Sequence, residues 1–212
     1  MPVSEQITVP LFPLNAVLFP GSLLPLHIFE ERYKVLINEC VDRNTEFGVN
    51  LLYEAKIRSI GCIAFVRDVL QRHPDGTMEV IVEGRRRYTL RSIVESDNPY
   101  QVGKITYYDD EDEPVDRSLL DRAAALYNQF VNAAFKGTVQ TIASFEDNEN
   151  LSFVMVQKSG LELIQRQLFL TLTSENKRLE FLISHLESLL PTVITKNQIE
   201  AIIINDGYVS LP

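Results

Sequence analysis

The sequence predicts an α+β fold in which a β-rich lobe with one amphipathic helix precedes an all-α bundle of about four helices. Three observations lead to this prediction. Short runs of β-branched and aromatic residues, separated by turn sequences, fill the first half of the chain. An acidic run that ends in a proline interrupts this pattern at 109–114. Beyond it, apolar residues recur at helical spacing as far as Leu190.

The β-rich lobe begins with apolar residues interspersed with prolines at 7–29. Prolines cannot donate to a sheet ladder, so this segment predicts edge strands or kinked extended segments. Residues 29–44 change to a helical period and predict a helix that covers the sheet. Pro74-Asp75-Gly76 has the composition of a tight turn and predicts a hairpin. The strands expected after the helix are 47–53, 60–71, 77–83, 87–94 and 100–108, which suggests a small mixed or antiparallel barrel.

The helical lobe is expected to start after the acidic run, with Asp116 or Ser118 as the N-cap of its first helix. Further helices are predicted at 151–158 and 161–172, divided at Gly160, and a last one that ends at Pro191. Short connections favour an antiparallel bundle. The tail contains three consecutive isoleucines followed by a turn sequence, and it predicts a docking strand. The expected division is therefore 1–112 for the β-rich lobe, 113–192 for the bundle and 193–212 for the tail.

The charge of the chain bears on its partners. The 212 residues carry a formal net charge of −9, and residues 1–108 hold 12 Lys and Arg against 13 Asp and Glu. The remaining residues hold 8 against 16. A protein that binds by neutralising phosphates needs a basic face, so this balance argues against nucleic acid as a partner.

The N-terminal region has no formal charge from Gln6 to Phe29, which is long enough to span a bilayer. Four prolines interrupt it, and each costs about 3 kcal/mol inside a helix. No basic segment precedes it, as a signal peptide requires. The sequence therefore predicts neither a membrane span nor a signal peptide, and a cytoplasmic protein is expected.

The sequence contains no motif for a metal, a cofactor or catalysis. Neither a GxxxxGK[ST] phosphate loop nor an HExxH zinc motif occurs. His27, His73 and His185 fall in different predicted elements, without a partner ligand nearby. Cys40 and Cys62 lie in apolar patterns, as buried reduced thiols do. No metal, no cofactor and no catalytic residue is expected.

Two charged clusters have alternative interpretations. Arg85, Arg86 and Arg87 could clamp a carboxylate or phosphate with their guanidinium forks. The favoured alternative is that strand residues alternate, with one arginine inward and the others solvated. The acidic run 109–113 lacks the glycine and the distant glutamate of a calcium loop, so a solvated hinge is expected.

Three proline-containing segments at the N-terminus resemble a known family. The segments 10–14 (PLFPL), 17–21 (VLFPG) and 25–33 (PLHIFEERY) are similar to the N-terminal, substrate-binding domain of Lon-type ATP-dependent proteases. Two later groups of residues also resemble this family, one at a strand junction and one in its closing helix pair. They are Val82, Glu83, Gly84, Arg87 and Tyr88, and then 168–170 with Asn176, Arg178, Leu179 and Leu182. The resemblance covers about 7–190.

This resemblance implies a PUA-like pseudo-barrel followed by a helical bundle. In Lon proteases the domain helps to recognise unfolded or tagged polypeptide and supports assembly, and a motor and a Ser-Lys protease domain follow it. The present chain stops at Pro212, without Walker motifs or that protease domain, so no enzymatic activity is expected. The expected function is a non-catalytic protein- or peptide-binding module, as an adaptor or a binder of unfolded polypeptide.

The expected binding surface is apolar and lies in the N-terminal segments, where an unfolded chain could add as a strand or fill side-chain pockets. Each of its residues could instead belong to the core. These residues are Phe12, Leu14, Phe19, Leu24 and Ile28. Two alternative functions stay open: an RNA-binding PUA-like protein, and a small-anion sensor with Arg87 in a pocket between the lobes. A homo-oligomer formed through the tail is a further expectation.

Overall fold

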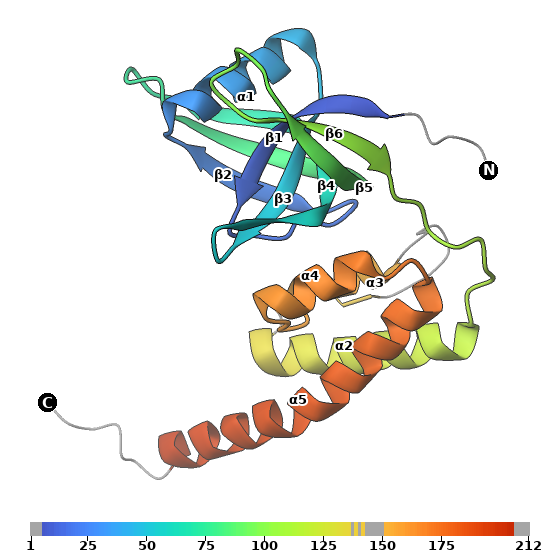
Figure 1. Cartoon of the computed structure of the whole chain (residues 1–212). Coiled ribbons are helices and arrows are strands. Elements are labelled where there is room, and N and C mark those ends of the chain that lie inside the picture. Colours follow the sequence, from blue (N-terminus) through green and yellow to red (C-terminus); the bar gives the residue numbers. More distant parts are fainter. Residues whose placement is uncertain (1–5, 137, 140, 143–150, 206–212) are drawn as a thin grey trace, which may run out of the picture. The chain divides into compact units, whose positions relative to one another are not determined.

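The computed structural model divides the chain into two units, and it describes residues 6–136, 138–139, 141–142 and 151–205 (Figure 1). The first unit comprises the chain up to Asp110 together with Glu162–Thr173. The second comprises Glu111–Leu161 and the chain from Ser174 onward. The boundary after Asp110 lies inside the acidic run, two residues before the end expected for the β-rich lobe.

Six strands of the first unit form one mixed sheet that curls into a pseudo-barrel (Figure 1). Neighbouring strands follow the order β2-β5-β4-β3-β1-β6, and β5 also pairs with β6. β1 and β3 pair in parallel, while the other pairs are antiparallel. The strands are β1 (Ile7–Leu14), β2 (Leu23–Ile28), β3 (Phe47–Tyr53), β4 (Lys56–Arg72), β5 (Met78–Val94) and β6 (Val102–Tyr107).

The long strand β5 connects the two halves of the sheet. Its first half pairs with β2 and its second half pairs with β6, while β4 lies along its other side. The sequence predicted two separate strands here, at 77–83 and 87–94. They are one strand because the ladder with β4 continues across a bulge, in which Arg85 and Arg86 of β5 stand opposite Ile63 alone.

The predicted hairpin between β4 and β5 is confirmed. The His73 amide donates to the Thr77 carbonyl at 2.9 Å, and the Asp75 carboxylate accepts from the Thr77 amide at 3.0 Å. Gly76 has a φ of 82°, which an L residue rarely adopts. The turn residues therefore specify this connection locally, as the sequence indicated.

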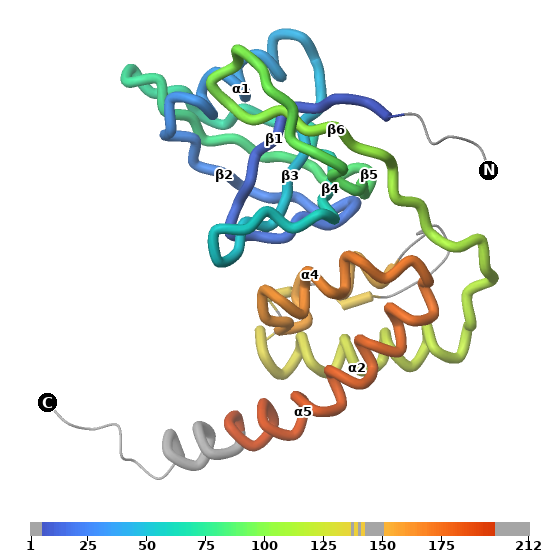
Figure 2. The backbone as a smooth tube through the Cα atoms, viewed as in Figure 1, coloured from blue at the N-terminus to red at the C-terminus, as the bar shows by residue number. Residues whose placement is uncertain are grey.

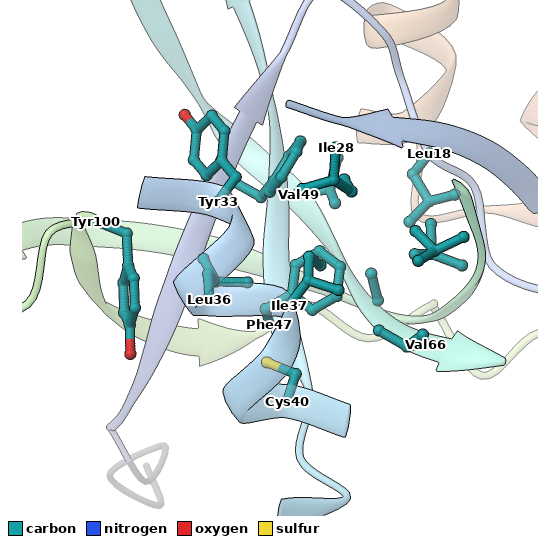
Figure 3. Close-up of a cluster of buried hydrophobic side chains, with 14 of the residues drawn as sticks. Leu18, Ile28, Tyr33, Leu36, Ile37, Cys40, Phe47, Val49, Val66 and Tyr100 are labelled. Carbon is teal, nitrogen blue, oxygen red and sulfur yellow. The ribbon is translucent and has the colours of Figure 1, made fainter. Parts of the chain in front are cut away.

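Helix α1 (Glu31–Arg43) provides one wall of the main core of the first unit (Figure 3). It ends where Asn44 adopts a left-handed conformation, with a φ of 53°. Phe29, predicted as the first residue of its apolar stripe, precedes the helix instead and is 61% exposed. The buried residues of α1 are Tyr33, Leu36, Ile37 and Cys40, which belong to the same cluster as Phe47 and Val49 of β3.

Helix α4 (Leu163–Thr171) is drawn in orange in Figure 2. It belongs to the first unit, although the sequence division assigned it to the helical lobe. Its Phe169 is fully buried and meets the edge of Phe19, with ring centroids 6.0 Å apart. The Gln167 amide donates to the Ile60 carbonyl of β4 at 3.0 Å. Helical periodicity shows that a helix has an apolar face, but it does not show which surface that face covers.

The second unit consists of helices. Its two long helices run parallel, because Asp116 bonds Asn176 near their first residues and Ala133 bonds Asn197 further along. Short antiparallel connections were expected, but the chain between the long helices includes α3, η1 and α4, which allows a parallel return. The elements are α2 (Arg117–Phe135), α3 (Leu151–Met155), the 3-10 turn η1 (Val156–Lys158) and α5 (Glu175–Asn205).

Two local signals of the helical region are confirmed. The Asp116 carboxylate caps α2 by accepting the amides of Ser118 at 2.8 Å and Leu119 at 3.4 Å. Gly160 follows η1 with a φ of 77°, as expected for a residue that ends a helical segment.

The end predicted for the last helix is wrong. Helix α5 continues through Pro191 to Asn205, so 202–204 are helical and do not form the expected strand. A proline removes one helical hydrogen bond, and Pro191 and Glu187 are both exposed, so that water can reach the freed Glu187 carbonyl. Residues 206–212 of the expected tail lie outside the described part. Among the described residues, no helix has both the length and the apolar character needed to cross a bilayer.

Candidate functional site

The apolar residues predicted to bind polypeptide are mainly part of the core. Phe12 is 4% exposed, Phe19 is fully buried and Ile28 is 1% exposed. Leu14 and Leu24 are partly buried and pack against the same cluster as Phe12 and Ile28. In this structure the five residues do not form an exposed apolar surface. Phe12, Phe19 and Ile28 are core residues, which was the alternative interpretation of the sequence. The apolar periodicity of the segment reflects the packing of the pseudo-barrel.

Arg87, the predicted anion ligand, is also enclosed. Its side chain is 3% exposed, and one guanidinium nitrogen donates to the carbonyls of Leu170 and Leu172, each at 2.7 Å. Its other terminal nitrogen pairs with Asp110. These carbonyls belong to the last turn of α4 and the residue after it, where a helix has unpaired acceptors. Arg87 therefore holds α4 in the first unit, and its guanidinium is not available at the surface.

Arg85 and Arg86 point outward. This agrees with the favoured interpretation of the arginine cluster, in which one arginine points inward and the other two are solvated. Their side chains are 47% and 55% exposed. In a regular strand two consecutive residues lie on opposite faces, but here both fall in the bulge of β5. The bulge thus brings two guanidinium groups to one region of the surface.

A hollow of about 410 Å³ lies beside these two arginines. It opens broadly to solvent and is formed by the first unit alone. Its residues come from the loop before β2, the residue before β3, the bulge of β5 with the two residues that precede it, and the end of β6. They are Gly21, Glu46, Glu83, Gly84, Arg85, Arg86 and Tyr107.

The close approach of two backbones shapes one wall of the hollow. The Gly84 amide donates to Ser22, and the Gly84 carbonyl accepts from Gly21, at 2.9 and 2.8 Å. A Cβ atom on Gly84 would lie 2.1 Å from the Phe19 carbonyl oxygen. Only glycine permits this contact, so the glycine before the arginines holds the loop against β5.

The charged groups of the hollow are paired at close range. The Arg86 guanidinium lies over the Tyr107 ring, 3.9 Å from its centroid, and it donates to Asp109 at 2.7 Å. Arg85 lies over the Phe65 ring at 5.4 Å, and its guanidinium is 3.3 Å from Glu83. A guanidinium held over an aromatic ring keeps its donors in a defined plane for a second group.

The acidic run after β6 is more ordered than the expected solvated hinge. Asp109 pairs with Arg86, and Asp110 pairs with the buried Arg87. Further on, Glu113 accepts from the Ser174 hydroxyl, which is the main cause of a lowered pKa of this carboxyl. The arginines of β5 and the start of α5 lie far from this run in the sequence, so a composition argument could not find these pairs.

The hollow is suited to binding by hydrogen bonds and stacking. Its seven residues offer guanidinium donors, carboxylate acceptors and a tyrosine ring. Across the part of the chain that the structure describes, no three His, Cys, Asp or Glu side chains gather as metal ligands do. Cys40 and Cys62 are both buried, as predicted. The arginine cluster and its preceding glycine were visible in the sequence, whereas Gly21, Glu46 and Tyr107 join them only through the strand order.

Comparisons with known proteins agree on one family. The model of the ATP-dependent protease La (LON) substrate-binding domain matches residues 8–188. The Lon protease of Parabacteroides distasonis is 32% identical over 161 residues, which is 70% of this chain and 19% of that protein. The Lon protease of Rhizobium meliloti is 25% identical over 213 residues, covering 94% of this chain and 26% of its own length. The chain thus spans about a fifth to a quarter of these relatives.

Solved structures show the same fold. A Lon N-terminal domain protein from Xanthomonas campestris superimposes with a TM-score of 0.65 at 25% identity, covering 84% of this chain and 98% of the other. The N-terminal domain of the Mycobacterium avium complex Lon protease gives a TM-score of 0.65 at 16% identity, with 85% and 98% covered. The second likeness supports the fold alone. Both agree with a pseudo-barrel of six strands and accompanying helices.

Proposed function

Since this chain belongs to the family of LON substrate-binding domains, we propose that it is a non-catalytic module that binds polypeptide in the cytoplasm. The family match concerns the substrate-binding part of the Lon proteases and not their catalytic part. We assign the binding to the hollow of the first unit, and not to the apolar segments that the sequence suggested. The observation that supports this choice is the pair of outward arginines at the bulge of β5, beside a partly exposed tyrosine.

The hollow has groups that suit a peptide backbone and its side chains. The Arg86 guanidinium can donate to backbone carbonyls, and the Tyr107 ring offers an apolar face beside it. The carboxylates of Glu46 and Glu83 can accept from amide groups. Such a mixture of donors, acceptors and a ring favours an extended chain over a small rigid ligand, and its broad opening permits a chain to pass through.

The test is binding of a reduced, alkylated and fluorescently labelled polypeptide to the purified protein, followed by fluorescence anisotropy. We expect Arg86→Ala and Tyr107→Ala each to weaken binding by about tenfold, as the loss of one good contact does. Arg32→Ala is the matched control, because Arg32 also lies over a tyrosine ring, at 4.5 Å, and also pairs with a carboxylate, that of Glu30, at 2.7 Å.

The outcome separates the proposed function from its alternatives. If the Arg86→Ala, Arg32→Ala and unaltered proteins bind the polypeptide with equal affinity, the hollow is not the binding site. No binding of any unfolded polypeptide would contradict the function itself. Binding of RNA with a steep salt dependence would favour the RNA-binding alternative, and binding of inorganic phosphate that Arg86→Ala abolishes would favour the anion sensor.

A further inference from the structure

Arg86 already holds a carboxylate of its own chain at the edge of the hollow. Its Nε and Nη2 atoms donate to Asp109 Oδ1 at 3.2 and 2.7 Å. Asp109 itself is not among the residues that line the hollow. The Asp109 carboxylate therefore binds the Arg86 guanidinium without filling the hollow.

The contact between Asp109 and Arg86 is of a kind that a ligand can replace. Both side chains are more than half exposed, at 67% and 55%, and exposed ion pairs of this kind contribute little to stability. The Tyr107 ring lies 3.9 Å from the guanidinium carbon and would keep the group in place after Asp109 leaves. Arg86 can thus exchange one carboxylate for another without losing its position.

The other carboxylates of the hollow determine how much negative charge it can accept. Glu83 is balanced by Arg85 at 3.3 Å. Glu46 forms no ion pair with any residue that the structure describes, and it is exposed. A ligand carboxylate on Arg86 would experience repulsion from Glu46, and a second ligand carboxylate would find no free guanidinium.

We propose that the hollow takes one acidic side chain of the bound polypeptide on Arg86, and that Asp109 is an intramolecular competitor for this position. The proposal rests on the proposed function and specifies the chemistry of the ligand. For an acidic ligand, two substitutions are each expected to raise the affinity. Asp109→Asn removes the competing carboxylate, and Glu46→Gln removes the repulsion. For a basic ligand, Glu46→Gln would instead lower the affinity, because that change removes an attractive carboxylate.

The experiment uses the full chain and three labelled peptides of equal length and identical apolar residues, which carry Glu, Lys or Ser at one central position. We expect the Glu peptide to bind most tightly to the unaltered protein. Asp109→Asn and Glu46→Gln should each raise its affinity by about two- to fivefold, and Arg86→Ala should abolish its advantage over the Ser peptide. Asp121→Asn is the matched control, because Asp121 is also an exposed carboxylate that faces an arginine, Arg117, at 4.0 Å.

Each contrary outcome has a separate meaning. If the Ser peptide binds and Tyr107→Ala weakens it, while Asp109→Asn changes nothing for the Glu peptide, the acidic preference is wrong and the proposed function remains. A weaker affinity of Glu46→Gln for the Lys peptide, together with tight binding of that peptide to the unaltered protein, would also overturn the preference. If no peptide binds, both proposals fail. Unchanged thermal unfolding of Asp109→Asn would show that the fold is intact, as expected for an exposed pair.

Discussion

Arg178 is the largest fully buried side chain among the described residues. Its Nη2 lies 2.6 Å from Glu175 and its Nε donates to the Ser152 hydroxyl at 2.9 Å, while the guanidinium lies over the Phe153 ring. Glu175 also accepts the Ser152 amide at 3.0 Å, in the first turn of α3. A buried charge is tolerated only when it is paired and hydrogen-bonded in this way. The cluster ties α3 to the first turn of α5.

Replacement of Arg178 with methionine is expected to destabilise the protein by about 3–5 kcal/mol, because Glu175 would remain buried without its partner. Equilibrium unfolding in urea measures the loss. The exposed Arg117 is the control, and Arg117→Met should cost less than about 1 kcal/mol. The double variant Arg178→Met with Glu175→Met should recover part of the stability. Equal effects of Arg178→Met and Arg117→Met would contradict this assignment.

Burial raises the pKa of the Cys62 thiol from 9.0 to about 12. The folded protein then keeps a proton that the unfolded chain loses above pH 9, so the stabilising contribution is complete below pH 9 and is lost as the pH rises to 12. Over this range, the thiol lowers the free energy of unfolding by about 1.4 kcal/mol per pH unit.

Unfolding in urea at several alkaline pH values tests this contribution. The pKa values of Tyr88 and Tyr100 are also raised by burial, so both the unaltered protein and a Cys62→Ala variant should lose stability with rising pH. The unaltered protein should lose it more steeply. Parallel pH profiles of the two proteins would show that Cys62 contributes nothing.

At the scale of elements, the outer edge of β2 shows how a proline protects a strand. The Ser22 carbonyl accepts from Gly84 of β5, so the backbone groups of residues 24, 26 and 28 also face β5. Those of Leu23, Pro25 and His27 face the free edge. Pro25 thus loses no ladder hydrogen bond, and it removes one donor from the edge where a second strand would otherwise pair.

Pro25→Val restores this donor and is expected to cause concentration-dependent self-association, because the edge would offer an uninterrupted set of donors and acceptors. Sedimentation velocity over a range of protein concentrations measures it. Pro74→Val, in the turn between β4 and β5, serves as the control and should leave the protein at its original association state. A Pro25→Val protein that sediments like the control at every concentration would show that Pro25 does not protect the edge.

At the scale of the whole molecule, the first unit is discontinuous in sequence. The chain passes through the second unit before α4 completes the first. Arg87 binds the carbonyls of Leu170 and Leu172, and the Tyr108 hydroxyl donates to the Thr171 carbonyl at 2.8 Å. Three successive carbonyls at the end of α4 are thus satisfied by side chains of the sheet region.

A fragment of residues 1–112, which the sequence alone defined as a lobe, is therefore expected to unfold without a cooperative transition. It would expose Phe19 and leave the Arg87 guanidinium without two of its acceptors. A fragment in which residues 1–110 are joined to 162–173 by a flexible linker of about ten residues should unfold cooperatively. Unfolding curves in urea and binding of a hydrophobic dye compare the two. Cooperative unfolding of both fragments would show that α4 is dispensable.

Interactions between residues that are close in the sequence could be predicted without the structure. The turn at Asp75 and Gly76, the cap at Asp116 and the family motifs of the N-terminal segments all depend on residues a few positions apart. Backbone geometry and side-chain hydrogen bonds act over these distances, so composition and spacing are sufficient to predict them.

The roles of single residues depended on pairings that only the tertiary structure specifies. Phe12 and Phe19 are core residues because strands distant in sequence cover them, and Arg87 is enclosed because α4 returns to the sheet. The hollow exists because a bulge in β5 turns Arg86 outward toward Tyr107 of β6. Apolar periodicity fixes which residues share a face, but burial of that face depends on long-range register, which local spacing does not encode.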